Sequence, residues 1–287
     1  MRFLRFECGG KPHLGVLEGA RIVDLTCISG EFPTMLSLIQ GGDCALRRVA
    51  DVVSVSAPVL NVKDARLLAP IERPGKYLAI GMNYRKHLEE ARRLGVTMSK
   101  QQFWFNKQTS CICGPYDDID PGVTEKLDYE VELGVVIGTA AKHVAEADAR
   151  NYVFGYVVVD DVSARDWQSH SPTFTVGKSF DTHGPIGPWI VTADEIVDPH
   201  ALRLRCLVNE QLRQDSNTGN MIFNIWEQIA YLSTAFTLEP GDLLATGTPE
   251  GVGAALQPPQ FLRVGDRVRC EVEGIGAIEN RVRARAM

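Results

Sequence analysis

The feature that most constrains the fold of this chain is a series of apolar segments rich in valine and isoleucine that recur from residue 76 onward. Turn-forming residues separate these segments, and their β-branched composition is typical of strands. Two helical patterns interrupt the series, at residues 85–94 and 221–236. Because strands and helices do not alternate regularly, the pattern disfavours a doubly wound sheet or a barrel of alternating strands and helices. It predicts an α+β domain dominated by strands.

The first 70 residues carry a different pattern. Short apolar stretches alternate around Gly-Gly and Glu-Gly pairs as in hairpins, and a helical pattern follows at residues 34–53. We therefore expect a small N-terminal α/β domain at residues 1–70 and a larger domain at residues 71–287. A chain of 287 residues is long enough for one large core with a small appendage.

Composition and charge argue against several classes of protein. The chain is 45% hydrophobic and 23% charged, as ordinary folded proteins are. Its net charge is −6 and no basic block is present, so a nucleic-acid partner is not expected. No apolar run approaches the roughly 20 residues that cross a bilayer, and the first residues lack the apolar core of a signal peptide. We expect a cytoplasmic protein without a membrane partner.

The seven cysteines are scattered and include no Cys-x-x-Cys pair of the kind that binds zinc. We expect reduced thiols, most of them buried. Cys111 and Cys113 lie in a segment flanked by glycine and proline, so a catalytic thiol at either position is a minor alternative.

Glu130 and Glu132 stand two residues apart in the apolar segment 127–137. In a strand this spacing projects both carboxylates from one face, about 7 Å apart along the chain. Such a pair needs water or a cation between the charges. Asp160 or Asp161, at the end of a second apolar segment, offers a third oxygen, and spacing alone does not choose between them. Three oxygen ligands favour Mg²⁺ or Mn²⁺, with Ca²⁺ as an alternative, whereas the solvated face of an edge strand is the competing interpretation.

Six motifs between residues 76 and 282 resemble those of the fumarylacetoacetate hydrolase (FAH) superfamily. They are IGMNYRKHLEE, FWFNKQTSCICGP, LDYEVELGVVIG, DDVSARDWQ, GKSFDTHGPIGPW and TGTPEGVG. The superfamily includes acylpyruvases, fumarylpyruvate hydrolases, oxaloacetate decarboxylases and hydroxymuconate isomerases. The resemblance implies an FAH-type mixed β-sandwich roll, a homodimer, and metal ligands at Glu130, Glu132 and Asp161.

The same resemblance places catalytic roles on His87, Glu90 and Lys178. His87 and Glu90 are three residues apart, so on a helix they share a face, where the carboxylate can hold the imidazole tautomer that accepts a proton. A solvated surface pair is the alternative. Lys178 lies in a turn-rich region, where its ammonium can stabilise an oxyanion or point to solvent.

Three further residues are predicted to bind substrate. Arg165 and Gln168 follow Asp161 at spacings of four and seven, the repeat of one helical face, and can hold a substrate carboxylate. A surface salt bridge is the competing interpretation. Thr248 lies in a glycine-rich segment whose backbone N–H groups can approach an anion, although a tight turn would use the same residues. This segment lacks the Lys and Ser/Thr pair of a phosphate loop, so nucleotide binding is disfavoured.

These residues predict a metal-dependent hydrolase that cleaves a C–C bond of a small 2-oxo acid, of the acylpyruvate or fumarylpyruvate type, through a metal-stabilised enolate. Hydrolysis is favoured because activation of water needs a general base such as His87. The same site would serve an oxaloacetate-type decarboxylase or a 2-hydroxymuconate-type isomerase or tautomerase. A catalytically silent binding homodimer is the non-enzyme alternative. Candidates for the distal end of the pocket are Phe103, Trp104, Gln108, Trp167 and Phe174.

Overall fold

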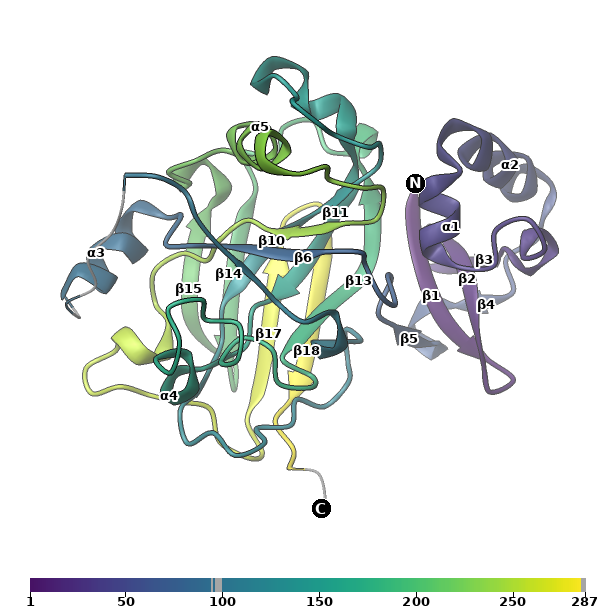
Figure 1. Cartoon of the computed structure of the whole chain (residues 1–287). Coiled ribbons are helices and arrows are strands. Elements are labelled where there is room, and N and C mark those ends of the chain that lie inside the picture. Colours follow the sequence, from purple (N-terminus) through teal and green to yellow (C-terminus); the bar gives the residue numbers. More distant parts are fainter. Residues whose placement is uncertain (94, 96–99, 285–287) are drawn as a thin grey trace.

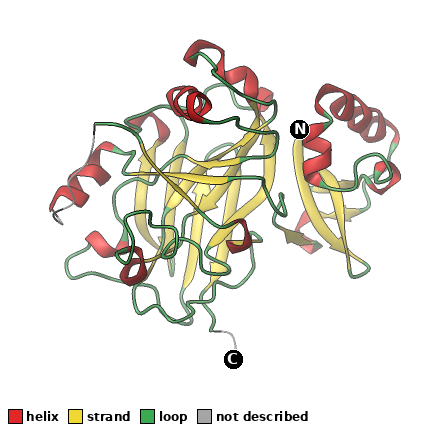
Figure 2. Ribbon diagram, in the orientation of Figure 1, coloured by secondary structure: helices red, strands yellow, loops and turns green. Residues whose placement is uncertain are grey.

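The computed structural model describes residues 1–93, 95 and 100–284. This part of the chain is rich in strands, and helices lie at its periphery (Figure 1, Figure 2). The predicted α+β class is confirmed. Among the described helices, none has the length and apolarity that a membrane crossing requires.

A large mixed sheet forms the centre of the fold. Its main path runs in the order β4 (Leu60–Asn61), β3 (Arg21–Asp24), β2 (Lys11–Glu18), β1 (Arg2–Cys8), β13 (Gly184–Thr192), β11 (Val153–Asp160), β10 (Val131–Ile137), β16 (Leu243–Ala245), β6 (Tyr77–Gly81) and β7 (Phe103–Asn106). Off this path, β5 (Arg66–Leu68) pairs with β1, and β8 (Ile112–Cys113) pairs with β13. Strands β10 and β11 are antiparallel, with Val131 opposite Asp160.

A second, four-stranded sheet packs against β10, β11 and β13. Its order is β15 (Gln211–Asn217), β14 (Arg203–Val208), β17 (Arg267–Val272) and β18 (Gly276–Arg281). A short ladder joins β9 (Leu127–Asp128) to β12 (Ser163–Ala164). The two packed sheets give the predicted sandwich-like arrangement, which covers one face of β10 and β11.

Strands β10 and β11 are buried on both faces. Alternate side chains of β10 and β11, such as Val135 and Val158, pack in the core that the second sheet closes. The intervening side chains, such as Val136 and Val159, pack in another core with the N-terminal helices. Burial on both faces explains why these strands read as continuous apolar runs rather than alternating ones.

The helices differ from the sequence prediction at residues 34–53 and at residues 221–224, the second of which the structure leaves outside any helix. The helical pattern predicted as one element at residues 34–53 forms two helices, α1 (Met35–Gln40) and α2 (Gly42–Val55), separated by Gly41. The others are α3 (Arg85–Arg93), α4 (Arg165–Gln168) and α5 (Ile225–Ala235). The predicted end of the α3 pattern at Leu94 lies outside the described residues. Short 3₁₀ segments are η1 (Thr26–Ile28), η2 (Val62–Asp64), η3 (Thr109–Cys111), η4 (Glu146–Tyr152), η5 (Ala193–Glu195), η6 (Thr218–Asn220) and η7 (Gly253–Ala255).

The N-terminal strands β1 to β4 belong to the same sheet as β10, β11 and β13. Strand β1 pairs with β13, with Arg2 opposite Val191. In Figure 1 strands β1, β2 and β3, with α1 and α2, form the purple group to one side of the main body, which contains β13. Hydrogen bonding therefore crosses the predicted boundary at residue 70, and the division into two domains stays a prediction.

Candidate active site

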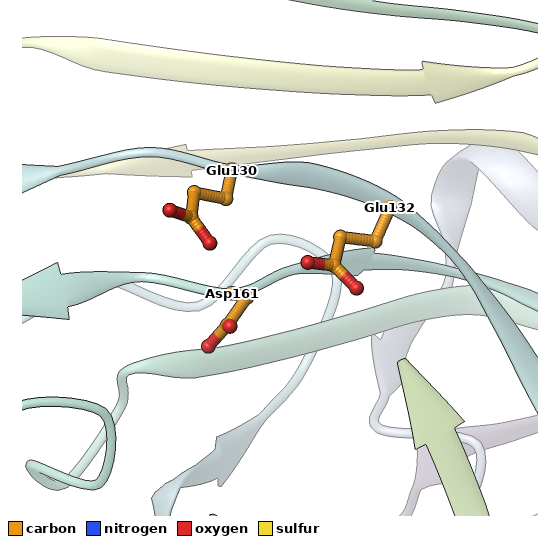
Figure 3. A group of neighbouring side chains, drawn as sticks. All are labelled: Glu130, Glu132 and Asp161. Carbon is orange, nitrogen blue, oxygen red and sulfur yellow. The ribbon is translucent and has the colours of Figure 1, made fainter. Parts of the chain in front are cut away.

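Three buried carboxylates meet where β10 and β11 lie side by side (Figure 3). Glu130 directly precedes β10, Glu132 lies within it, and Asp161 directly follows β11. Each of the three offers an oxygen within 4.8 Å of the others. None of the three residues is more than 5% exposed, so water cannot screen their charges freely.

Side-chain alternation explains why Asp161 joins this group and Asp160 does not. Asp161 has the parity of Val159, which faces the core next to the N-terminal helices, whereas Asp160 has the parity of Val158 and faces the other core. The carboxylate of Asp160 instead accepts the backbone N–H of Glu130 at 2.9 Å. Burial raises the pKa of Asp160 to about 7.

The pKa values of Glu130 and Glu132 are shifted in opposite directions. Burial opposes the charge of Glu130, but Lys178 and Arg165 lie beside it and hold its pKa below the usual range. Burial, followed by repulsion from Asp161 and Glu130, raises the pKa of Glu132 well above its usual range. A cation beside such a buried carboxylate would favour its charged form, and the oxygen-only donor set suits a divalent cation. The residues present therefore fit the predicted metal site.

Two buried lysines contact this group. Lys178 donates to Glu130 Oε2 at 2.6 Å and to Asp161 Oδ2 at 2.7 Å. Lys107 donates to Asp161 Oδ1 at 2.6 Å and to the backbone carbonyls of Lys178 and His183. An ammonium has three N–H donors, so Lys107 is fully committed to the protein. The sequence analysis did not identify Lys107, whose partner Asp161 is 54 residues away along the chain.

Arg165 and Gln168 lie together on α4, beside the carboxylates. Arg165 Nη2 donates to Glu130 Oε1 at 2.6 Å, and its Nη1 donates to Gln168 Oε1 at 3.1 Å. Burial opposes the charge of Arg165, yet Glu130 and Asp128 raise its pKa above the usual range. The guanidinium therefore remains a fixed positive charge at the edge of the site.

His87 and Glu90 form a hydrogen-bonded pair on α3. His87 Nδ1 lies 3.2 Å from Glu90 Oε2, and the carboxylate also accepts the backbone N–H of Gly251 at 3.0 Å. Their side chains are 12% and 19% exposed, so the solvated surface pair considered as an alternative is disfavoured. With Nδ1 held by a carboxylate, Nε2 is the ring nitrogen left to exchange a proton.

The loop that leads into α3 is fixed by a buried amide. Asn83 Nδ2 donates to the carbonyls of Thr246 and Phe223, each at 2.9 Å, and Asn83 Oδ1 accepts the N–H of Phe223. The preceding residue, Met82, lines the site with φ of 55°, in the left-handed region. Strained backbone of this kind persists where its surroundings hold it, and it clusters at functional sites.

The glycine-rich segment at residues 246–254 presents its backbone N–H groups to carboxylates of the protein itself. Gly247 donates to Glu132 Oε2 at 2.7 Å, and Gly251 donates to Glu90. Both glycines have φ of 100°, a conformation that side chains rarely adopt. The backbone N–H groups that the sequence suggested for binding an anion therefore bind Glu132 of the carboxylate group and Glu90 of the His87–Glu90 pair.

The hydroxyl of Thr248 is engaged by the protein. It donates to the carbonyl of Val131 at 2.9 Å and accepts Gln214 Nε2 at 2.9 Å. Its side chain nevertheless lines the cavity described next. The role of Thr248 in substrate binding stays a prediction.

A cavity of about 270 Å³ joins these groups. It is lined by all the predicted site residues except Asp161, which contacts the cavity-lining Lys178. Phe174 is the one distal-end candidate among its described lining residues. The lining residues that the sequence did not assign individually to the site are mostly apolar, and they are Ile80, Gly81, Met82, Ala91, Phe105, Ser169, Val252, Ala254 and Ala255.

The cysteine alternative is not supported. Cys111 and Cys113 are buried, and burial raises the pKa of Cys111 to about 11 and that of Cys113 well above its usual range. A nucleophilic thiol needs a lowered pKa. The described site instead combines carboxylates, a histidine and the cationic side chains of lysine and arginine. This composition is that of enzymes that bind a divalent metal and act on small acids.

Comparisons with known proteins agree with this class. Residues 76–283 match the family model "Fumarylacetoacetate (FAA) hydrolase C-terminal". The chain is 41% identical to the mitochondrial oxaloacetate tautomerase FAHD2B of Bos taurus, over 98% of this chain and 91% of that protein.

Two solved structures show the same fold. Fumarylacetoacetate hydrolase from Exiguobacterium antarcticum has a TM-score of 0.86 at 35% identity, with 99% of this chain and 100% of that one covered. Maleylpyruvate hydrolase from Sphingobium sp. SYK-6, in complex with manganese(II) and pyruvate, has a TM-score of 0.83 at 31% identity with the same coverage. The chain belongs to the fumarylacetoacetate hydrolase family and is an enzyme of that family.

Proposed function

We propose that this protein is a divalent-cation-dependent enzyme that enolises a small 2-oxo acid, with Glu130, Glu132 and Asp161 as the metal ligands. The observation that carries the proposal is the buried carboxylate group at the same cavity as the His87–Glu90 pair. Mg²⁺ or Mn²⁺ is the expected cation, with Ca²⁺ as an alternative, because every ligand is a carboxylate oxygen. When bound, the cation would polarise the 2-oxo group of the substrate.

The other residues supply binding and proton transfer. Arg165 and Gln168 would bind the substrate carboxylate, since a guanidinium recognises carboxylates bidentately. His87 would take a proton from the carbon next to the 2-oxo group and deliver one to the oxygen of that group, with Glu90 fixing the ring orientation. Lys178, which lines the cavity, would stabilise the negative charge that develops on oxygen.

Keto–enol tautomerisation of an oxaloacetate-type acid is the first reaction we propose. Tautomerisation moves one proton between the carbon and the oxygen of the 2-oxo group and needs no second substrate, and a cavity of about 270 Å³ suits a molecule of this size. The 41% identity to oxaloacetate tautomerase, across nearly the whole chain, supports the same choice.

Hydrolysis of a C–C bond in an acylpyruvate or fumarylpyruvate is the second candidate, and it is the reaction that the sequence favours. In this reaction His87 would draw a proton from water, which would then add to the distal carbonyl. The maleylpyruvate hydrolase of similar fold supports this alternative.

Turnover of three substrates, measured in the presence of Mn²⁺, tests both reactions. Oxaloacetate is followed by loss of enol absorbance, and acetylpyruvate and fumarylpyruvate by release of pyruvate. Glu90→Gln should lower kcat about 100-fold, because a positioned general base contributes roughly that factor. Glu89→Gln, on the exposed face of the same helix, is the matched control and should retain kcat. If Glu90→Gln retained full kcat on every substrate that the wild type turns over, the assigned role of the His–Glu pair would be wrong.

A further inference from the structure

Asp128, at the end of β9, has a fully buried carboxylate that accepts four hydrogen bonds. Its Oδ1 accepts the backbone N–H groups of Tyr129 at 3.0 Å and Gly253 at 2.7 Å. Its Oδ2 accepts the N–H of Ala254 at 3.0 Å and Nε of Arg165 at 2.8 Å. A carboxylate has about four lone-pair sites, so no acceptor remains for a ligand. Asp128 therefore acts through its neighbours.

Two of those neighbours line the cavity, namely Arg165 and Ala254. The guanidinium is planar, so a hydrogen bond that fixes Nε also fixes the directions of the two Nη groups. One Nη group reaches Glu130 and the other reaches Gln168. Asp128 thus sets the orientation of the whole fork at the edge of the cavity.

The cavity wall is held equally closely. A Cβ at Gly253 would lie 2.6 Å from Asp128 Oδ1 and 2.2 Å from the carbonyl oxygen of Gln260. Both distances are too short for real contacts, so glycine at this position permits the approach to Asp128. The wall at residues 253–255 and Arg165 consequently share one anchor.

We propose that Asp128 is a positioning residue that determines affinity for the substrate carboxylate rather than the rate of proton transfer. This inference rests on the proposed function, in which Arg165 binds that carboxylate. Within the described part of the chain, the four hydrogen bonds of Asp128 reach neither His87 nor Glu90. The chemical step should therefore be insensitive to it.

Asp128→Asn tests the proposal, because it replaces one acceptor oxygen with an NH₂ group that faces existing donors. We expect KM to rise about tenfold and kcat to change less than twofold, which is the signature of lost binding that is equal in ground and transition states. A fall in kcat with unchanged KM would overturn the proposal.

Binding of pyruvate, measured by calorimetry at saturating Mn²⁺, separates this inference from the proposed function. Absence of both pyruvate binding and turnover in the wild type would refute the function itself. If the wild type binds pyruvate and Asp128→Asn binds it equally well, only the inference fails. The Mn²⁺ affinity of the variant should stay within twofold of the wild type, and a parallel loss of Mn²⁺ affinity would assign Asp128 to the integrity of the metal site instead.

Two further variants complete the test. Asp166→Asn is the matched control, since Asp166 lies next to Arg165 on α4 and, like Asp128, accepts backbone N–H groups, those of Glu125 and Trp167. It should leave KM unchanged. Arg165→Lys keeps the charge but lacks Nε, so it must reproduce the rise in KM even if Asp128→Asn does not fold. In the Arg165→Lys background, Asp128→Asn should add less than twofold, whereas additive effects would contradict action through Arg165.

Discussion

At the residue scale, His183 shows how burial sets a pH limit on the fold. Its side chain is fully buried, Nε2 lies 2.9 Å from the carbonyl oxygen of Asp120, and Nδ1 has no partner among the described residues. The ring stacks on Phe180, with centroids 5.1 Å apart. Burial lowers the pKa of His183 to about 4, so the ring is neutral in the folded protein at neutral pH.

This pKa predicts a loss of stability in mild acid. The folded pKa lies below the unfolded value near 6.5, so the unfolded chain binds a proton that the folded one rejects as pH falls from 6.5 towards 4. Between pH 7 and pH 5 the contribution of His183 to this loss should be about 2 kcal/mol. His183→Gln keeps a donor near Asp120 but cannot titrate. Chemical denaturation at both pH values should show a smaller difference for the variant, and equal differences would contradict the assignment.

The residues that the sequence predicted and those that it missed differ in a physical way. Glu130 and Glu132 could be predicted from the sequence, because two glutamates at this spacing in an apolar run are unusual in themselves. Asp161 was chosen over Asp160 by resemblance, although the parity of the buried strand gives the same answer once both faces are known to be covered. Lys107 carried no local signal, because its significance comes from contacts formed only on folding.

At the element scale, the backbone of β11 approaches that of β13 too closely at Gly155 to admit a side chain. A Cβ at Gly155 would lie 2.3 Å from the backbone carbonyl oxygen of Val191 in β13. Backbone atoms in a sheet cannot yield as the end of a flexible side chain can. The position of β11 matters for the site because Asp161 directly follows this strand.

Gly155→Ala should therefore lower the free energy of unfolding by about 2 kcal/mol or more, since overpacking in a core typically costs about 1–3 kcal/mol. Gly30→Ala is the control, because a Cβ there would meet nothing within 4 Å and no left-handed φ is required. Denaturant titration of the two variants measures the difference. Comparable stability of both would mean that the strands separate at low cost.

Strand segments were predicted well because β-branched composition and turn residues are local signals. The break at Gly41 was not, since the apolar pattern continues across it from α1 to α2. The glycine-rich segment at residues 246–254 was recognised as a place where amides bind anions. Which anions they bind depends on strands and helices distant in the sequence, such as Glu90 on α3.

At the scale of the whole molecule, stability and metal binding should be coupled through Glu132. Burial, followed by repulsion from Asp161 and Glu130, raises the pKa of its carboxylate, so the charged form of Glu132 opposes folding of the metal-free protein. A cation that binds the folded state stabilises it by mass action, by about 2.7 kcal/mol at 100 times Kd. The same residue is thus expected to destabilise the metal-free protein and to stabilise the loaded one.

Glu132→Gln separates the two effects. Without metal, the variant should be more stable than the wild type by about 1 kcal/mol or more, because the neutral amide removes the repulsion. With excess Mn²⁺, the wild type should gain thermal stability and the variant should not. Glu89→Gln should respond to Mn²⁺ as the wild type does. An equal Mn²⁺ response in Glu132→Gln would exclude Glu132 as a ligand.

The overall architecture was predictable because class follows from the succession of strands and from the family motifs. The joining of residues 1–70 to β13 was not, since the pairing of Arg2 with Val191, far away along the chain, leaves no mark in a local pattern. The two-domain division, the homodimer and the cytoplasmic location stay predictions. The comparisons bear on location only through relatives whose names say mitochondrial.

The amides of residues 247, 251, 253 and 254 bind Glu132, Glu90 and Asp128, three carboxylates with different proposed roles. These contacts are made by main chain, so alanine scanning would leave every donor in place. Such a scan would report glycines needed for backbone shape and would pass over the amides as ligands. These main-chain hydrogen bonds can therefore persist while the side chains of the same segment diverge. Replacement of single amides by esters is the chemistry that would reveal their contribution.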